Sequence, residues 1–168
     1  MKICVLGLGN MGLPVAVNLA RAGHDVTGAN IVDVPAATEA GVAVSTDATV
    51  ALRDREVVFC LLPDLPYLEP MLPALIEGGT KDLVVMSTIS PSAVRGLAER
   101  LDGQVNVMDA CMSGGVAKAK LSRAVLIQAL RFYARQGGSS LQGFIGLLGE
   151  LRLAAPGVGG ARGREPVP

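Results

Sequence analysis

Three glycines near the amino terminus constrain the fold of this chain more than any other feature. Gly7, Gly9 and Gly12 follow the pattern G-x-G-x-x-G directly after the apolar run 3–6, and a helical pattern follows over 11–21. Between a strand and a helix, the first glycine permits a tight turn and the second lets backbone approach a pyrophosphate. The third lets the helix pack closely on the strand, and the free N–H groups at the helix start favour phosphate. The pattern therefore predicts a dinucleotide-binding turn.

Apolar runs and helical patterns alternate along the first two thirds of the chain. This alternation is typical of a doubly wound parallel sheet with helices on both faces. We expect strands at 3–6, 25–29, 42–44, 57–62, 83–86 and 105–108. We expect helices at 11–21 and 35–40, one that ends near residue 53, one within 67–76, and one from 90 to 101. Asp33 is predicted to cap the second helix, and Thr46 or Asp47 the third.

Length and composition favour one soluble domain. At 168 residues, half of them hydrophobic, the chain is long enough to bury a core. The formal net charge is zero, so nothing indicates binding to nucleic acid or to an anionic membrane. Asn10 and the glycines interrupt the amino-terminal apolar run, which argues against a secretory signal, and no apolar stretch reaches the length of a membrane span. We expect a cytoplasmic protein.

The cysteines agree with that location. Cys4, Cys60 and Cys111 lie in or beside apolar runs, and an odd number of buried thiols fits a reducing compartment better than a disulfide framework. The chain has a single histidine, His24, which we interpret as a loop residue between a helix and a strand. No metal site made of cysteines and histidines is expected.

The composition changes after about Lys120. Residues 121–168 contain six arginines, two glutamates, nine glycines and neither lysine nor aspartate, so a net charge of −4 gives way to +4. We therefore predict a domain over 1–120, a possible helix over 121–135, and a flexible tail over 136–168.

Four segments of the chain resemble the amino-terminal domain of the β-hydroxyacid dehydrogenases. That family includes 3-hydroxyisobutyrate dehydrogenase, tartronate semialdehyde reductase and, more distantly, 6-phosphogluconate dehydrogenase. The segments are GLGNMGLPVAVNLARAGHDV, CLLPD, MSTISPSAVRGLAERL and VMDACMSGGVAKAK, in the order that the family has them. The resemblance implies an α/β domain of the Rossmann type that binds NAD or NADP. It also implies hydride transfer between that cofactor and a small 3-hydroxy acid or its semialdehyde.

The resemblance also implies roles for particular residues. It places Gly7, Leu8, Gly9, Asn10, Met11 and Gly12 in the turn along the cofactor phosphates, and Leu62, Pro63 and Asp64 in a second loop along the cofactor. It places Thr88 near the nicotinamide ribose. Ser113, Gly114 and Gly115 match the turn that holds a substrate carboxylate, although these residues by themselves would also fit an ordinary turn after the sixth strand.

The choice between NAD and NADP depends on the end of the second strand. There a carboxylate would accept hydrogen bonds from the ribose hydroxyls of NAD, whereas an arginine nearby would pair with the 2′-phosphate of NADP. This chain has Asn30 followed by Ile31, with Asp33 three residues further on. The preference stays open, with a slight lean to NADP because no carboxylate stands at residue 30.

The chain departs from the family after the substrate motif. Relatives continue into a long interdomain helix, whose lysine acts as general acid/base, and a helical second domain. No lysine follows Lys120, and we interpret Lys118 and Lys120 as solvated, so no catalytic residue is assigned. The second helical domain is expected to be missing, either because the chain is truncated or frame-shifted after about residue 120 or because it is a real short variant.

Two classes of function remain open at this point. The first is the cofactor-binding domain of an oxidoreductase, and the second is a non-catalytic dinucleotide-binding scaffold or sensor. The expected partners are a small carboxylate, bound weakly at most, and a second copy of the chain, bound through uncovered apolar surface.

Overall fold

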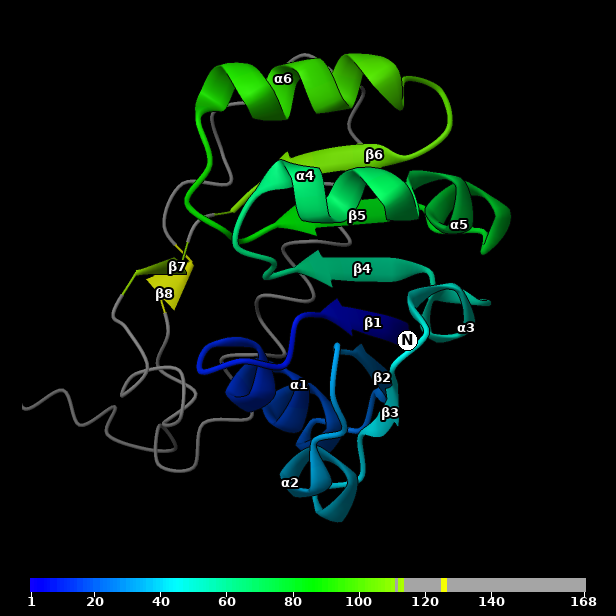
Figure 1. Ribbon diagram of the computed structural model, residues 1–168, viewed down its shortest axis with the longest axis vertical. Helices are drawn as coiled ribbons and strands as arrows, with labels where there is room; N and C mark the ends of the chain where they lie inside the picture. Colours follow the sequence, from blue (N-terminus) through cyan, green and yellow to red (C-terminus); the bar gives the residue numbers. More distant parts are fainter. Residues whose placement is uncertain (111, 114–124, 127–168) are drawn as a thin grey trace, which may run out of the picture.

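The computed structural model describes residues 1–110, 112–113 and 125–126 (Figure 1). The strands are β1 (Lys2–Leu6), β2 (Asp25–Ala29), β3 (Ala43–Ser45), β4 (Val57–Cys60), β5 (Asp82–Val85), β6 (Asn106–Asp109), β7 (Met112–Ser113) and β8 (Val125–Leu126). The helices are α1 (Gly12–Arg21), α2 (Pro35–Glu39), α3 (Ala48–Leu52), α4 (Leu65–Leu68), α5 (Leu72–Glu77) and α6 (Pro91–Arg100). A 3-10 turn, η1 (Glu69–Met71), joins α4 to α5.

The first six strands form one parallel sheet in the order β3-β2-β1-β4-β5-β6, which confirms the predicted doubly wound topology. The central strand β1 pairs with β2 on one side and β4 on the other, so Leu6 lies opposite both Ala29 and Cys60. The strand order reverses between β1 and β4. In sheets of this kind ligands bind outside the carboxyl ends of the strands at that reversal.

Both faces of the sheet are buried, as its parallel strands require. On one face Ile3 and Val5 of β1 pack with residues of α1 and α2. On the other face Cys4 and Leu6 pack with residues of α3, α5 and α6. Figure 1 shows the strands stacked through the molecule, with helices lying along them. The continuous apolar run of β1 therefore follows from burial on both sides.

The single helix predicted within 67–76 corresponds to α5 only from Leu72 onwards, because prolines divide residues 65–77 into three elements. Pro66, Pro70 and Pro73 each stand in the first turn of a separate element, namely α4, η1 and α5. A proline lacks the N–H that a continuing helix needs, but it fits the first turn of a new one. The strand predicted over 57–62 is also shorter than expected and ends at Cys60.

Two predicted helix starts are confirmed and one is wrong. The carboxylate of Asp47 accepts a hydrogen bond from the N–H of Thr49 at 2.8 Å and caps α3, and Ser90 caps α6. Asp33 does not cap α2, because the helix begins at Pro35 and its cap position is Val34. The Oδ1 atom of Asp33 instead accepts from the N–H of Val34, its own neighbour, at 2.9 Å.

A short antiparallel pair lies outside the main sheet. Ser113 of β7 is paired with Val125 of β8, and Met112 with Leu126. The helix predicted over 121–135 is therefore wrong at Val125–Leu126, which are extended. The remainder of that range and the tail predicted over 136–168 lie outside the described residues.

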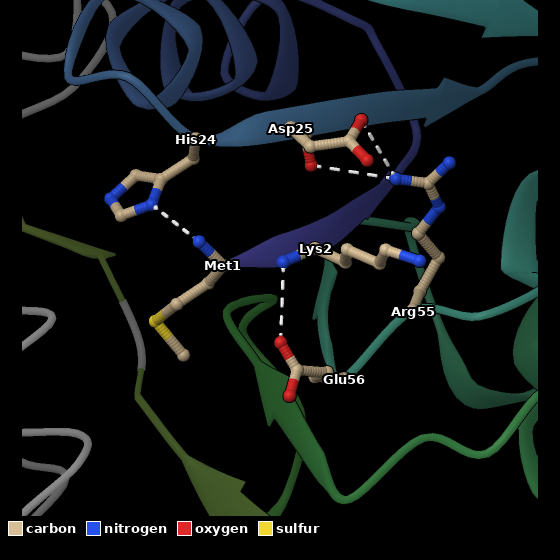
Figure 2. A network of polar contacts seen from close by, with 6 residues as sticks. All are labelled: Met1, Lys2, His24, Asp25, Arg55 and Glu56. Atoms are coloured by element: carbon tan, nitrogen blue, oxygen red, sulfur yellow. Dashed lines mark hydrogen bonds and ion pairs between the residues drawn. The ribbon is translucent and has the colours of Figure 1, made fainter.

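Charged groups join the strands at the edge opposite their carboxyl ends (Figure 2). Arg55 makes an ion pair with Asp25 at 3.0 Å, and the N–H of Lys2 donates to Glu56. The amino group of Met1 lies 3.4 Å from Nδ1 of His24, at the junction of α1 and β2 where the sequence places a loop histidine. These contacts stabilise the amino-terminal ends of β1, β2 and β4. The glycine turn lies at the other end of the strands.

Candidate dinucleotide site

The glycine turn follows β1 and begins with a residue in the left-handed region. Gly7 has φ of +89°, and its N–H donates to the carbonyl oxygen of Ala29 at 2.9 Å. A Cβ at Gly7 would also lie 3.1 Å from the carbonyl oxygen of Leu61. Both the backbone conformation and the contact with the chain after β4 therefore favour glycine at this position.

The two other glycines of the motif differ in what surrounds them. A Cβ at Gly12, the first residue of α1, would lie 1.7 Å from the carbonyl oxygen of Gly7, so the helix start touches the turn. A Cβ at Gly9 would meet nothing within 4 Å. The fold thus requires glycine at 12, whereas the open space at Gly9 leaves room for a phosphate to approach the backbone.

Leu8 joins the turn to β2 through both its side chain and its backbone. Its side chain is buried and occupies the position of the missing Cβ of Gly28, which would lie 2.5 Å from Cδ1 of Leu8. Its N–H donates to Oδ1 of Asn30 at 3.2 Å. The Nδ2 atom of Asn30 in turn donates to the carbonyl oxygen of Val32 at 3.1 Å. Asn30 therefore connects the turn to the segment after β2.

The N–H groups of Gly9 and Asn10 donate to none of the described residues. Both residues are exposed and lie just before Met11, the residue that precedes α1, and the first turn of α1 contains no acidic side chain. A helix amino terminus carries free N–H groups and a partial positive charge, which bind phosphate. The residues present therefore fit the pyrophosphate of a dinucleotide.

A second loop follows β4 beside the first. The N–H of Leu61 donates to the carbonyl oxygen of Leu6 at 2.9 Å, which continues the pairing of β1 with β4. Pro63 and Asp64 are exposed, and the carboxylate of Asp64 accepts from the N–H of Leu65 at 2.8 Å at the start of α4. Asp64 therefore has a structural role as a helix cap in addition to its predicted place along the cofactor.

Ser87 fixes this second loop, and sequence reasoning did not select it. Its hydroxyl donates to the carbonyl oxygen of Leu62 and lies 3.5 Å from that of Cys60. A hydroxyl residue directly after a buried strand of a parallel sheet was the available signal. Thr88, which was selected instead, is the exposed residue next to it on the same edge. Gly28 was also missed, because its role depends on the side chain of Leu8.

The predicted residues are only partly brought together within the described part of the chain. The glycine turn, Asn30, the loop of Leu62 to Asp64 and Thr88 all lie at the carboxyl ends of β1, β2, β4 and β5. Ser113 was predicted in a turn, but its backbone belongs to β7. Figure 1 shows β7 and β8 on the side toward which β1, β4 and β5 point. Gly114 and Gly115 lie outside the described residues.

Other kinds of site find no support in this part of the molecule. Among the described residues, no group of three or more histidine, cysteine, aspartate or glutamate side chains could hold a metal ion. None of the helices described is long and apolar enough to cross a membrane.

Residues 2–129 match the model of a family described as the NAD binding domain of 6-phosphogluconate dehydrogenase. The chain belongs to this family. The match reaches past residue 120 and includes the glycine turn, Asn30, the second loop and Ser113. This NAD-binding domain is therefore related to oxidoreductases, as the four sequence segments implied.

Curated relatives extend beyond the domain. A 2-hydroxy-3-oxopropionate reductase of Escherichia coli is 33% identical over 129 residues, which cover 71% of this chain and 44% of the relative. A 3-hydroxyisobutyrate dehydrogenase of Pseudomonas aeruginosa is 37% identical over 131 residues, which cover 70% of this chain and 42% of the relative. The chain thus spans less than half the length of these relatives.

A solved structure agrees with the fold. A 3-hydroxyisobutyrate dehydrogenase of Mycobacterium tuberculosis, whose structure is named with L-serine, superposes with a TM-score of 0.74 at 28% identity. The superposition covers 89% of this chain and 51% of that one. The NAD-binding domain therefore has the fold of one half of such a dehydrogenase.

Proposed function

We propose that this domain binds NADP or NAD with the pyrophosphate on the turn from Gly7 to Gly12. The observation that carries the proposal is the placement of this turn at the reversal of strand order. There the N–H groups of Gly9 and Asn10 have no acceptor among the described residues, and the space at Gly9 is open. Leu62, Pro63, Asp64 and Thr88 lie at the same edge and are proposed to line the rest of the cofactor.

For the nucleotide, the proposal gives NADP a slight advantage. Residue 30 is a neutral asparagine, whereas a carboxylate at this position would repel a 2′-phosphate. The carboxylate of Asp33 is exposed, but one of its oxygens accepts the N–H of Val34. Titration with NADP and with NAD under the same conditions measures the preference directly.

For the reaction, we propose that the domain belongs to an oxidoreductase acting on a small 3-hydroxy acid or the matching semialdehyde. When bound, the cofactor would supply or accept a hydride. The relatives named above support this class of substrate. Ser113, Gly114 and Gly115 are proposed to hold the substrate carboxylate.

One observation favours a second candidate, a dinucleotide-binding scaffold or sensor without catalysis. Residues 121–168 contain no lysine, so the chain offers no match to the family's general acid/base there. The two candidates share the cofactor site and differ in catalysis. Oxidation of a hydroxy acid by the chain would exclude the second candidate, whereas binding without turnover is compatible with both.

Isothermal titration with NADP and NAD tests cofactor binding. Gly9→Val should abolish binding without unfolding the domain, because the side chain enters open space where the pyrophosphate would lie. Gly96→Val is a matched control, because Gly96 lies in α6, and a Cβ there also meets nothing within 4 Å. The control should bind like the unsubstituted chain. Equal affinity of all three proteins would contradict the proposed site.

A further inference from the structure

We propose that Asn30 is a positioning residue that holds the phosphate turn through Leu8 and makes no direct contact of its own with the ribose or its 2′-phosphate. The proposal rests on the function proposed above. It concerns the contact that links the end of β2 to the N–H groups proposed to face the phosphates. Asn30 is expected to set the affinity for every adenine dinucleotide to about the same degree.

The polar groups of Asn30 are engaged with protein backbone. Its Oδ1 accepts the N–H of Leu8 at 3.2 Å, and its Nδ2 donates to the carbonyl oxygen of Val32 at 3.1 Å. Its own N–H donates to Ser45 of β3 at 3.1 Å. The side chain is half-buried between these segments. A side chain bonded to backbone in this way holds the neighbouring segments in position.

Leu8 transmits this contact to the phosphate turn. With its side chain seated over Gly28 and its N–H directed at Asn30, Leu8 is held to β2 from two sides. The next two N–H groups, those of Gly9 and Asn10, are then left for the ligand. Without an acceptor at residue 30, the part-buried N–H of Leu8 would lose its partner, and an unmade hydrogen bond favours rotation of that peptide. The ligand would then have to reorder the turn at a cost in affinity.

An asparagine meets two requirements at once. It supplies the acceptor for Leu8 without placing a charge at the end of β2. An aspartate would keep that acceptor, but it would lose the donor to Val32 and add a negative charge where a 2′-phosphate would lie. The acceptor and the charge can therefore be separated by substitution.

Three variants make that separation. Asn30→Ala removes both contacts, and Asn30→Asp keeps only the acceptor. Asn106→Ala is the matched control, because Asn106 is exposed at the start of β6 and donates to Asp82 at 3.1 Å, at the opposite edge of the sheet. The probes are ADP, NAD and NADP in isothermal titration. Amide hydrogen exchange of Leu8 in the free protein is the readout of the anchor.

Asn30→Ala should weaken binding of all three probes about tenfold, leave the ratio of the NADP and NAD affinities within about twofold, and speed exchange of the Leu8 amide. Asn30→Asp should restore slow exchange and the affinity for ADP and NAD, but not for NADP. Asn106→Ala should leave binding and Leu8 exchange unchanged.

A changed ratio of the NADP and NAD affinities in Asn30→Ala would overturn the proposal, because Asn30 would then contact the ribose or its 2′-phosphate directly. Unchanged exchange at Leu8 in that variant would also overturn it. If the unsubstituted chain binds none of the probes, the proposed function is overturned. The predicted effect of Asn30 on affinity is then overturned with it. The Leu8 amide separates these cases, because its exchange is measured without ligand.

Discussion

A Cβ atom on Gly12 would lie 1.7 Å from the carbonyl oxygen of Gly7. The start of α1 therefore rests directly on the turn that leaves β1, and the approach involves backbone that cannot rotate away. The same motif leaves open space at Gly9. The glycine motif thus contains one residue that the fold requires, Gly12, and one that the proposed ligand requires, Gly9. Separate substitutions test the two requirements.

Gly12→Ala should destabilise the domain strongly. The added methyl group overlaps a backbone oxygen, so α1 must shift away from β1, and overpacking of this kind costs about 3 kcal/mol or more. Urea unfolding followed by circular dichroism measures the change. Gly96→Ala, with open space around its Cβ in α6, should instead stabilise by about 0.5–1 kcal/mol. Equal stability of the two variants would contradict the close approach.

Two carboxylates at the amino edge of the sheet should affect the pH dependence of stability in opposite directions. Hydrogen bonds from the N–H of Lys2 and from Lys81 lower the pKa of Glu56. Burial raises the pKa of Asp82, against a hydrogen bond from Asn106. The lowered pKa of Glu56 means stability that is present above its unfolded value of about 4.3 and is lost as pH falls through the folded value. The raised pKa of Asp82 means a penalty that is present above its folded value and disappears as pH falls.

Glu56→Gln should therefore lower the free energy of unfolding at neutral pH by less than about 1 kcal/mol, because the Glu56 side chain is 44% exposed and solvent screens its charge. This loss should vanish at acid pH, where the native glutamate is protonated. Asp82→Asn should be neutral or stabilising at neutral pH. Urea unfolding at neutral and acid pH measures both, and a stabilising Glu56→Gln would contradict the assignment.

The two cysteines of the described residues should react slowly in the folded protein. Burial raises the pKa of Cys4 to about 12 and that of Cys60 to about 11, so both thiols are protonated at neutral pH. The thiolate is the reactive form. In a Cys111→Ser background, reaction with a disulfide reagent at mildly alkaline pH should be about 100-fold slower in buffer than in urea. Fast labelling in buffer would show that the central strands open.

The chain by itself should not oxidise hydroxy acids at an appreciable rate. A general acid/base contributes about 10²- to 10⁴-fold to such a step, and no lysine follows Lys120. Formation of NADH or NADPH from 3-hydroxyisobutyrate, D-glycerate and 3-hydroxypropionate measures this. Lys118→Ala and Lys120→Ala should change nothing, and robust turnover lost with either variant would identify that lysine as the base.

Self-association should increase with concentration. Exposed large hydrophobic side chains in the described part of the chain include Ile31, Val50 and Tyr67, with Ile31 92% exposed. Where exposed apolar side chains adjoin one another, the surface they form promotes contact between copies. Sedimentation velocity over a wide range of concentration measures it, and a monomer at every concentration would contradict the prediction.

The elements could be predicted where a local pattern has one physical solution. The apolar runs of β1, β4 and β5 indicated strands buried on both faces, and the cap of α3 was narrowed to Thr46 or Asp47, of which the structure has Asp47. The helix predicted within 67–76 was only partly right, because Pro70 and Pro73 stand at the starts of two separate elements, η1 and α5. Asp33 failed because a cap depends on the exact residue at which a helix begins.

By itself, then, the sequence determined that a glycine turn joins a buried strand to a helix, and that parallel strands alternate with helices. Both follow from spacing along the chain, which is local. Only the tertiary structure decided that Asn30 meets Leu8, that Leu8 occupies the place of a side chain at Gly28, and that Ser87 holds the loop after β4. These contacts join residues twenty or more positions apart. They exist because pairing of β1 with β2 and β4, and of β4 with β5, brings the carboxyl ends of these strands to one edge.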